Sequence, residues 1–92
     1  MGAIVLLPGV LRPDAGDEAR LAVSAPSTVR DVLGEIAARW PRLSKRLRDE
    51  RGDLRRYVNL YVDGEECRRV QGLETPVPDG AEIQIIPSVA GG

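Results

Sequence analysis

Segments near both ends of this chain have the hydrophobic patterns of strands, and a segment between them has the period of a helix. Ala3–Leu7 is apolar without a break and stops at turn residues, which is typical of a strand that is central in a sheet or covered on both faces. Arg20–Ser24 alternates, with Leu21 and Val23 on one face, and predicts a second strand. The turn-forming residues Pro13–Asp17 lie between these segments, so we predict a hairpin with a polar loop.

The clearest helix in the chain follows the second strand. Its apolar residues share one face at helical spacing: Val29, Val32, Leu33, Ile36, Ala37 and Trp40. Thr28 is the expected N-cap, and Asp31 completes a pattern close to a capping box. Pro41 ends the helix. We expect a second, shorter helix after it, with Leu43 and Leu47 as its buried anchors.

The pattern in the C-terminal half predicts three strands joined by turns. Arg48–Arg56 is highly charged and contains a glycine, so we expect a solvated loop. Val58–Val62 alternates strongly, and the Asp-Gly pair after it predicts a tight turn into a short strand near Glu66–Arg68. Pro78–Gly80 is another turn signal, and Glu82–Pro87 is the last predicted strand.

These segments give the order β-β-α-(short α)-β-β-β. One amphipathic helix that covers one face of a mixed sheet is an α+β roll. A length of 92 residues allows one domain, and no repeat or linker divides the chain, so we expect a single domain over 1–92. Residues 88–92 are expected to form a flexible C-terminal tail.

The composition argues against several classes of function. Acidic and basic residues nearly cancel to a net charge of −1, which disfavours a nucleic-acid or anionic-membrane partner. The N-terminal apolar run is too short for a membrane span or a signal-peptide core, so we expect a cytoplasmic protein. The chain has no His, and it contains no phosphate-binding glycine loop and no nucleophile-elbow motif. We therefore expect no metal site, no bound cofactor and no stand-alone enzyme activity.

Two charged clusters leave alternatives open. Cys67 is the only cysteine and lies between Glu65-Glu66 and Arg68-Arg69. The arginines would lower the pKa of the thiol and make it reactive, but without a His partner we prefer an ordinary residue in a short edge strand. Arg55-Arg56 and Arg68-Arg69 either dock an acidic partner or carry solvated charge, and we prefer solvated charge. Acidic pairs such as Glu65-Glu66 are expected to be solvated surface.

The C-terminus is the strongest candidate for chemistry. It leaves the last predicted strand as Pro87-Ser88-Val89-Ala90-Gly91-Gly92. Residues without a Cβ can enter a narrow channel, and a terminal glycine carboxylate is unhindered, so a partner enzyme can bring it against the α-phosphate of ATP. A sulfur nucleophile can then attack the acyl-adenylate and leave a terminal thiocarboxylate. A frayed, inert terminus is the alternative.

Segments spread over nearly the whole chain carry a family pattern. They are the N-terminal strand, Thr28–Leu33, Val58–Gly64, Gly72-Leu73 and Thr75-Pro76. The most specific part is Pro78–Ile83 running into Ile85–Pro87 and Val89–Gly92. Together they resemble the MoaD/ThiS family of ubiquitin-like sulfur carriers. The Leu11–Pro13 loop start and the long charged insert before Tyr57 are most similar to the CysO-like branch.

This resemblance implies a β-grasp roll in which a mixed sheet of four to five strands packs on one main helix. It implies that Gly92, with Gly91, is the reactive carrier terminus. An E1-like partner of the MoeB/ThiF type would adenylate Gly92 with ATP before its conversion to a thiocarboxylate. A sulfurtransferase or other sulfur donor and a downstream sulfur-accepting synthase are the other implied partners. The acceptor pathway would be cysteine, molybdopterin, thiazole or specialised-metabolite biosynthesis. Ser88 stands where related tails often have Pro or Ala.

Strand alternation also predicts where a partner docks. We expect the helix to cover the face that bears Val5, Leu7, Val58, Leu60, Ile83 and Ile85. The opposite face, which a β-grasp sheet leaves open, would then carry Ile4, Leu6, Tyr61 and Ile86. We predict an exposed apolar patch there that docks the activating enzyme together with the tail residues Val89, Ala90, Gly91 and Gly92. A shifted register with Ile4 and Leu6 in the core is the alternative.

Two other functions stay open at this point. The chain would be a ubiquitin-like modifier if Gly92 were joined to lysines by isopeptide bonds. It would be a non-catalytic β-grasp interaction module if its tail were inert.

Overall fold

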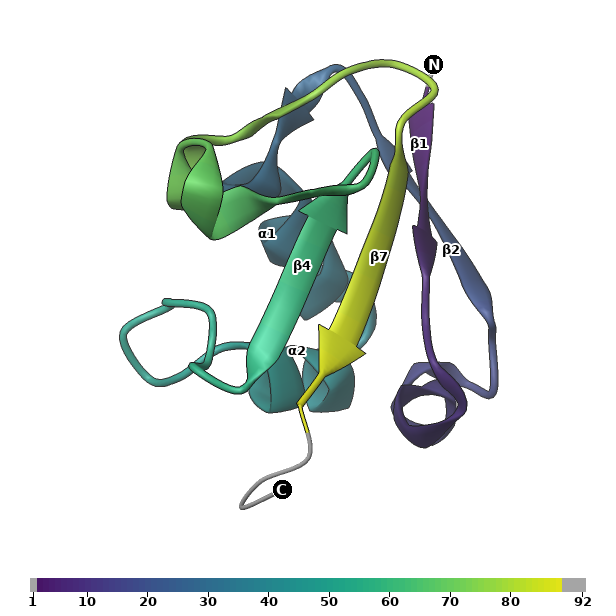
Figure 1. Cartoon of the computed structure of the whole chain (residues 1–92). Helices are drawn as coiled ribbons and strands as arrows, with labels where there is room; N and C mark the ends of the chain where they lie inside the picture. The colour runs from purple at the N-terminus through teal and green to yellow at the C-terminus, as the bar shows by residue number, and fades with distance from the viewer. Residues whose placement is uncertain (1, 89–92) are drawn as a thin grey trace.

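The computed structural model describes residues 2–88 and shows a sheet with the helices on one of its faces (Figure 1). The elements are β1 Gly2–Leu6, β2 Arg20–Ser24, β3 Ser27–Thr28, α1 Val29–Arg39, α2 Pro41–Leu47, β4 Val58–Val62, β5 Glu65–Glu66, β6 Pro76–Val77 and β7 Glu82–Pro87. The main sheet has five strands in the order β2-β1-β7-β4-β5, and β3 pairs with β6 in a separate small sheet. β1 and β7 are parallel and their other neighbours antiparallel, so the sheet is mixed, as predicted.

β1 and β2 form the predicted hairpin, but the connection between them is not the loop expected for Pro13–Asp17. Gly9–Ala15 form a 3₁₀ helix instead. Leu11 and Ala15 of this helix are buried, and this burial explains why a segment of turn-forming residues adopts a helix. Gly16 then takes a left-handed conformation (φ 64°) that ends the helix and turns the chain toward β2.

α1 begins with the capping box expected from the sequence. The Thr28 side chain accepts a hydrogen bond from the Asp31 N–H at 3.2 Å, and the Asp31 carboxylate accepts one from the Thr28 N–H at 3.2 Å. These bonds satisfy N–H groups that have no partner within the first turn. α2 follows directly, with Pro41 at its start and Leu43 and Leu47 buried as predicted.

The core lies between the helices and one face of the main sheet. Every residue predicted for that face is buried: Val5, Leu7, Val58, Leu60, Ile83 and Ile85. The helices supply the other side of the core. The buried helix residues there are Val29, Val32, Leu33, Ile36, Leu43 and Leu47. Ala37 and Trp40, at the end of the predicted stripe, are only partly buried. The buried pattern confirms the register predicted for the strands.

Two further elements, the segment after β4 and the small β3–β6 sheet, differ from the prediction. The short strand after β4 contains only Glu65 and Glu66, and Cys67–Arg69 turn into a 3₁₀ helix. The turn occurs because the Glu66 carboxylate caps the Arg68 N–H at 2.7 Å and Cys67 is buried. The β3–β6 sheet was not predicted, because strands of two residues are too short to show alternation.

Helix side chains cover the outer edge of the main sheet at β2. Glu35 accepts a hydrogen bond from the Ser24 N–H at 2.9 Å, which lowers the pKa of the Glu35 carboxyl. Arg39 donates to the Ala22 carbonyl at 2.7 Å and pairs with Glu35 at 3.1 Å. An edge whose backbone groups are occupied is a poor template for strand addition. The broad face of the sheet opposite the helices, by contrast, stays open (Figure 1).

Candidate functional site

The predicted reactive tail leaves the sheet from its central strand, because β7 lies between β1 and β4. β7 ends at Pro87, and the Ser88 N–H donates a hydrogen bond to the Tyr57 carbonyl. Ser88 is the root of the tail and its only described residue. Residues 89–92, which include the predicted reactive glycines, lie outside the described residues.

Alternation along β7 separates the core from the open face. Ile85 is 1% exposed, whereas its neighbour Ile86 is 46% exposed. Ile4, Leu6 and Tyr61 lie on the same open face as Ile86 and are half-buried. The register that places Ile4 and Leu6 in the core is therefore wrong. The docking role of the open-face residues stays a prediction.

The open face does not carry one continuous apolar patch. Gln84 of β7 pairs with Leu6 on one side and with Tyr61 on the other, so a polar side chain separates the two apolar ones. The predicted apolar patch is thus interrupted by Gln84, a residue of β7 that falls between β1 and β4. An apolar hollow of about 190 Å³ remains beside the tail root, lined by Leu6, Leu7, Pro8, Gln84, Ile85 and Ile86.

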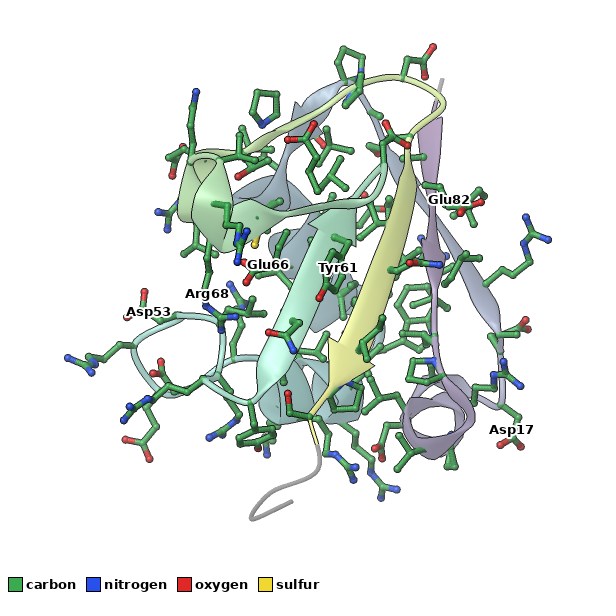
Figure 2. The ribbon with its side chains drawn as sticks, viewed as in Figure 1. Asp17, Asp53, Tyr61, Glu66, Arg68 and Glu82 are labelled. Atoms are coloured by element: carbon green, nitrogen blue, oxygen red, sulfur yellow. The ribbon has the colours of Figure 1, made fainter. Side chains whose placement is uncertain are left out.

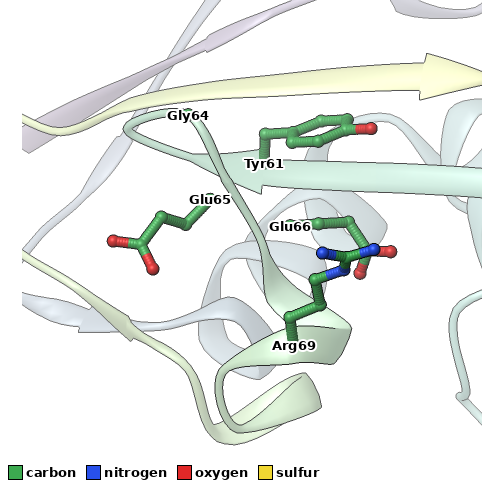
Figure 3. A pocket seen from close by; sticks show the side chains of 5 residues that line it. All are labelled: Tyr61, Gly64, Glu65, Glu66 and Arg69. Atoms are coloured by element: carbon green, nitrogen blue, oxygen red, sulfur yellow. The ribbon is translucent and has the colours of Figure 1, made fainter.

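A second hollow, of about 400 Å³, lies beside the turn after β4 and is lined by Tyr61, Gly64, Glu65, Glu66 and Arg69 (Figure 3). Tyr61 lies opposite Glu66 in the β4–β5 pair, so its ring has charged rather than apolar neighbours. Of the predicted solvated acidic pair, Glu65 is exposed and Glu66 is half-buried. This hollow suits a polar or charged group of a partner, and the hollow beside the tail root suits an apolar one.

Cys67 starts a 3₁₀ helix and is 1% exposed, so it is not the edge-strand residue that the sequence suggested. Burial raises the pKa of the Cys67 thiol, and the neighbouring Glu66 carboxylate raises it further. Arg68 acts in the opposite direction but is outweighed. The raised pKa keeps the thiol protonated, which disfavours the alternative in which the arginines activate it and agrees with the preferred interpretation of an unreactive residue.

The four arginines of the two pairs differ in whether their side chains hold backbone carbonyls, and Arg68 does so although it is exposed. Arg68 donates to the Arg55 carbonyl at 2.7 Å, and Arg55 donates to the Lys45 carbonyl at 3.0 Å. Arg56 and Arg69 are exposed. The guanidinium of Arg68 lies beside the outer edge of β4 (Figure 2). Two of the four side chains therefore fasten the charged insert to the rest of the domain, a role that the sequence did not indicate.

Residues 2–88 lack two other kinds of feature. No group of three or more His, Cys, Asp or Glu side chains is arranged to hold a metal ion in this part of the chain. None of the helices described has the length and apolar character needed to cross a membrane.

Asn59 is a residue beside the tail root that the sequence did not single out. Its side-chain amide donates to the Ser88 hydroxyl at 3.1 Å and accepts from the Arg68 guanidinium at 3.3 Å. Alternation along β4 placed Asn59 on the open face. Its two hydrogen-bond partners come from other parts of the chain, so no local sequence pattern predicts these bonds.

The whole chain is similar to known carrier proteins. Residues 5–92 match the model of the ThiS family. This chain belongs to the ThiS family. It is 37% identical over 94 residues to the sulfur carrier protein CysO of Mycobacterium tuberculosis, with 100% of both chains covered. The predicted resemblance to the MoaD/ThiS family and its CysO-like branch is thereby confirmed.

Solved structures share the fold of this ThiS-family chain. A chain of the BexX/CysO complex of Amycolatopsis orientalis superposes with a TM-score of 0.88 at 34% identity, covering 98% of this chain and 99% of that one. SAMP1 of Haloferax volcanii superposes with a TM-score of 0.83 at 26% identity, covering 100% of each chain. The predicted β-grasp roll, with a mixed sheet packed on one main helix, is confirmed.

Proposed function

We propose that this ThiS-family chain is a sulfur carrier whose reactive group is the carboxylate of its own C-terminal Gly92. The observation that carries the proposal is the full-length likeness to CysO, which includes the Gly-Gly end. The geometry of the tail root supports it. The tail begins at the end of a central strand and beside an apolar hollow, where a partner can dock and reach the terminus.

The chemistry needs two steps at Gly92. In the first, a carboxylate oxygen attacks the α-phosphorus of ATP held by the partner, pyrophosphate leaves, and an acyl-adenylate forms. In the second, hydrosulfide from a donor attacks the carbonyl carbon, the bond to AMP breaks, and a thiocarboxylate, AMP and a proton result. The carrier supplies no acid, base or metal to either step, in keeping with a chain that has no His.

The activating partner is an E1-like adenylating enzyme of the MoeB/ThiF type. Gly92 is four residues beyond Ser88, and a chain of that length spans at most about 14 Å. The adenylation site must therefore lie within that distance of Ser88, and the docking surface must border the tail root. Ile86 and Leu6 provide apolar contacts there, and Ile4 and Tyr61 flank them. A sulfurtransferase or other donor and a sulfur-accepting synthase use the same tail in turn.

Intact-mass spectrometry tests the proposal. The chain is incubated with its cognate E1-like enzyme, ATP and sulfide. We expect the mass to increase by the replacement of one oxygen with sulfur, and tandem fragmentation to place the change at Gly92. A matched chain that lacks Gly91 and Gly92 serves as the control and should keep its mass. An unchanged mass of the full chain, with an enzyme that thiolates another carrier, would contradict the proposal.

Conjugation to proteins is a second candidate function, favoured by the likeness to the archaeal modifier SAMP1. Gly92 would be adenylated in the same way, but a lysine amine rather than a sulfur nucleophile would displace AMP. Tryptic peptides from cells that express the chain distinguish the two functions. The last tryptic site before the tail is Arg69, so lysines that carry the remnant Val70–Gly92 indicate a modifier. A thiocarboxylate terminus without such adducts indicates a carrier.

A further inference from the structure

A row of hydrogen bonds ties the root of the tail to the charged insert. The Asn59 side chain lies in the middle of the row, bonded to the Ser88 hydroxyl at 3.1 Å and to Arg68 at 3.3 Å. Arg68 is itself held, because its guanidinium donates to the Arg55 carbonyl at 2.7 Å and its N–H donates to the Glu66 carboxylate at 2.7 Å. The row therefore starts from fixed backbone and ends at the tail.

The sheet register explains why Ser88 meets Asn59. Asn59 pairs with Ile86 across the antiparallel β4–β7 ladder, and Ser88 is two residues farther along, which makes it the diagonal neighbour on the same face. The Ser88 N–H also donates to the Tyr57 carbonyl. Ser88 is thus held to β4 by its backbone and by its side chain.

We propose that Arg68, Asn59 and Ser88 form a latch that sets the direction in which the tail leaves the sheet, and that they are positioning residues for the reaction at Gly92. The inference rests on the proposed carrier function. Its physical basis is the distance between root and terminus. Because Gly92 is four residues beyond Ser88 and at most about 14 Å from it, the direction of the chain at Ser88 limits the region that the terminal carboxylate can reach.

The latch limits the directions in which the chain can leave Ser88, so fewer unproductive directions remain when the partner binds. A carrier that already points its tail toward the enzyme loses less conformational freedom on binding, so the gain appears as tighter productive binding. The bonds of the latch are exposed to solvent and contribute little to folding. Their removal is therefore expected to change activation more than stability.

Steady-state kinetics of Gly92 adenylation test the latch, with pyrophosphate release by the cognate E1-like enzyme as the readout. We expect Ser88→Ala and Asn59→Ala each to raise the KM for the carrier about three- to tenfold with kcat within about twofold. The double variant should be no worse than either single variant, because each removes the same bond. Ser88→Thr, which keeps the hydroxyl, should restore the KM, and Ser24→Ala on the far edge strand should leave it unchanged.

The outcomes separate failure of the latch from failure of the carrier function. If the wild-type chain is adenylated and the single variants keep its KM, or if the two losses multiply in the double variant, the latch is wrong and the carrier function stands. If the wild-type chain is not adenylated by an enzyme that activates another carrier, the carrier function and the latch both fall. Amide ¹⁵N relaxation of the free chain is an independent measurement. Asn59→Ala should increase the motion of Ser88, and unchanged relaxation would overturn the latch.

Discussion

Ile85 and Ile86 are neighbours in β7 that face opposite sides of the sheet, so alanine substitutions at the two positions separate folding from docking. Ile85 is 1% exposed and is part of the core, whereas Ile86 is 46% exposed beside the tail root. We expect Ile85→Ala to destabilise the fold and leave docking intact. We expect Ile86→Ala to do the reverse.

The difference in stability follows from burial. Truncation of a fully buried Ile to Ala costs about 2–5 kcal/mol, out of the roughly 5–15 kcal/mol that stabilises a domain of this size. At about 4–8 °C per kcal/mol, Ile85→Ala should lower the Tm by at least about 8 °C. Full burial of an Ile side chain contributes about 1.5–3 kcal/mol, and about half of the Ile86 surface is already exposed. Ile86→Ala should therefore cost at most about 1 kcal/mol.

The effect on activation should have the opposite order. A well-packed apolar residue at the centre of an interface typically contributes about 1–2 kcal/mol to binding. Ile86→Ala should thus lower kcat/KM for Gly92 adenylation about 5- to 30-fold. Ile85→Ala, assayed well below its Tm, should keep kcat/KM within about threefold of the wild-type value, since Ile85 is 1% exposed and offers a partner almost no surface although it lines the hollow.

Thermal unfolding by circular dichroism and pyrophosphate release with the E1-like enzyme provide the two measurements. Ile85→Val is a milder matched control that should lie between Ile85→Ala and the wild type in Tm. The reasoning is refuted if Ile86→Ala is adenylated as efficiently as the wild type. It is also refuted if Ile86→Ala lowers the Tm as much as Ile85→Ala does, because the two residues would then not face opposite sides.

Two further predictions concern the fold and the buried thiol. Thr28→Ala removes the capping box of α1 and should lower the free energy of unfolding in urea by about 1 kcal/mol, whereas no change would mean that the cap is not formed in solution. Burial raises the pKa of the Cys67 thiol, so the neutral thiol stabilises the folded chain relative to the unfolded one. This stabilisation is complete below the unfolded pKa of about 8.5 and is lost as pH rises through the folded pKa. Wild type should therefore lose more stability than Cys67→Ala between about pH 7 and about pH 10, and equal losses would contradict a raised pKa.

Much of the fold was predictable from the sequence because its elements carry local signals. The stripe of α1 and its Thr28 cap, and the alternation of β4 and β7, depend on residues that are close in the chain. The 3₁₀ helix at Gly9–Ala15 was missed because its formation depends on burial of Leu11 against distant elements. The β3–β6 pair was missed for a similar reason, since two-residue strands are defined by a partner far along the chain.

The site was predictable only in part, because its parts depend on different ranges of sequence. The Gly-Gly tail is a local motif, and the open face follows from strand alternation. The interruption of the patch by Gln84 required the strand order, since only the positions of β1 and β4 on either side of β7 bring Leu6 and Tyr61 next to it. The bond between Asn59 and Ser88 required the register of β4 against β7 as well.

The central position of β7 explains how a sulfur carrier can present its C-terminus to partner proteins. One set of alternate residues in β7 packs in the core, and the other set lies on the open face and borders the tail root. The hydrogen bond from Asn59 to Ser88 extends the fixed part of the molecule to Ser88. A terminal carboxylate that starts from so rigid a root can be presented at a defined distance from any surface that docks beside it. An edge strand would provide a weaker root, because it is held by a neighbour on one side only. The carrier function therefore depends on where in the sheet the last strand lies as much as on the two glycines that follow it.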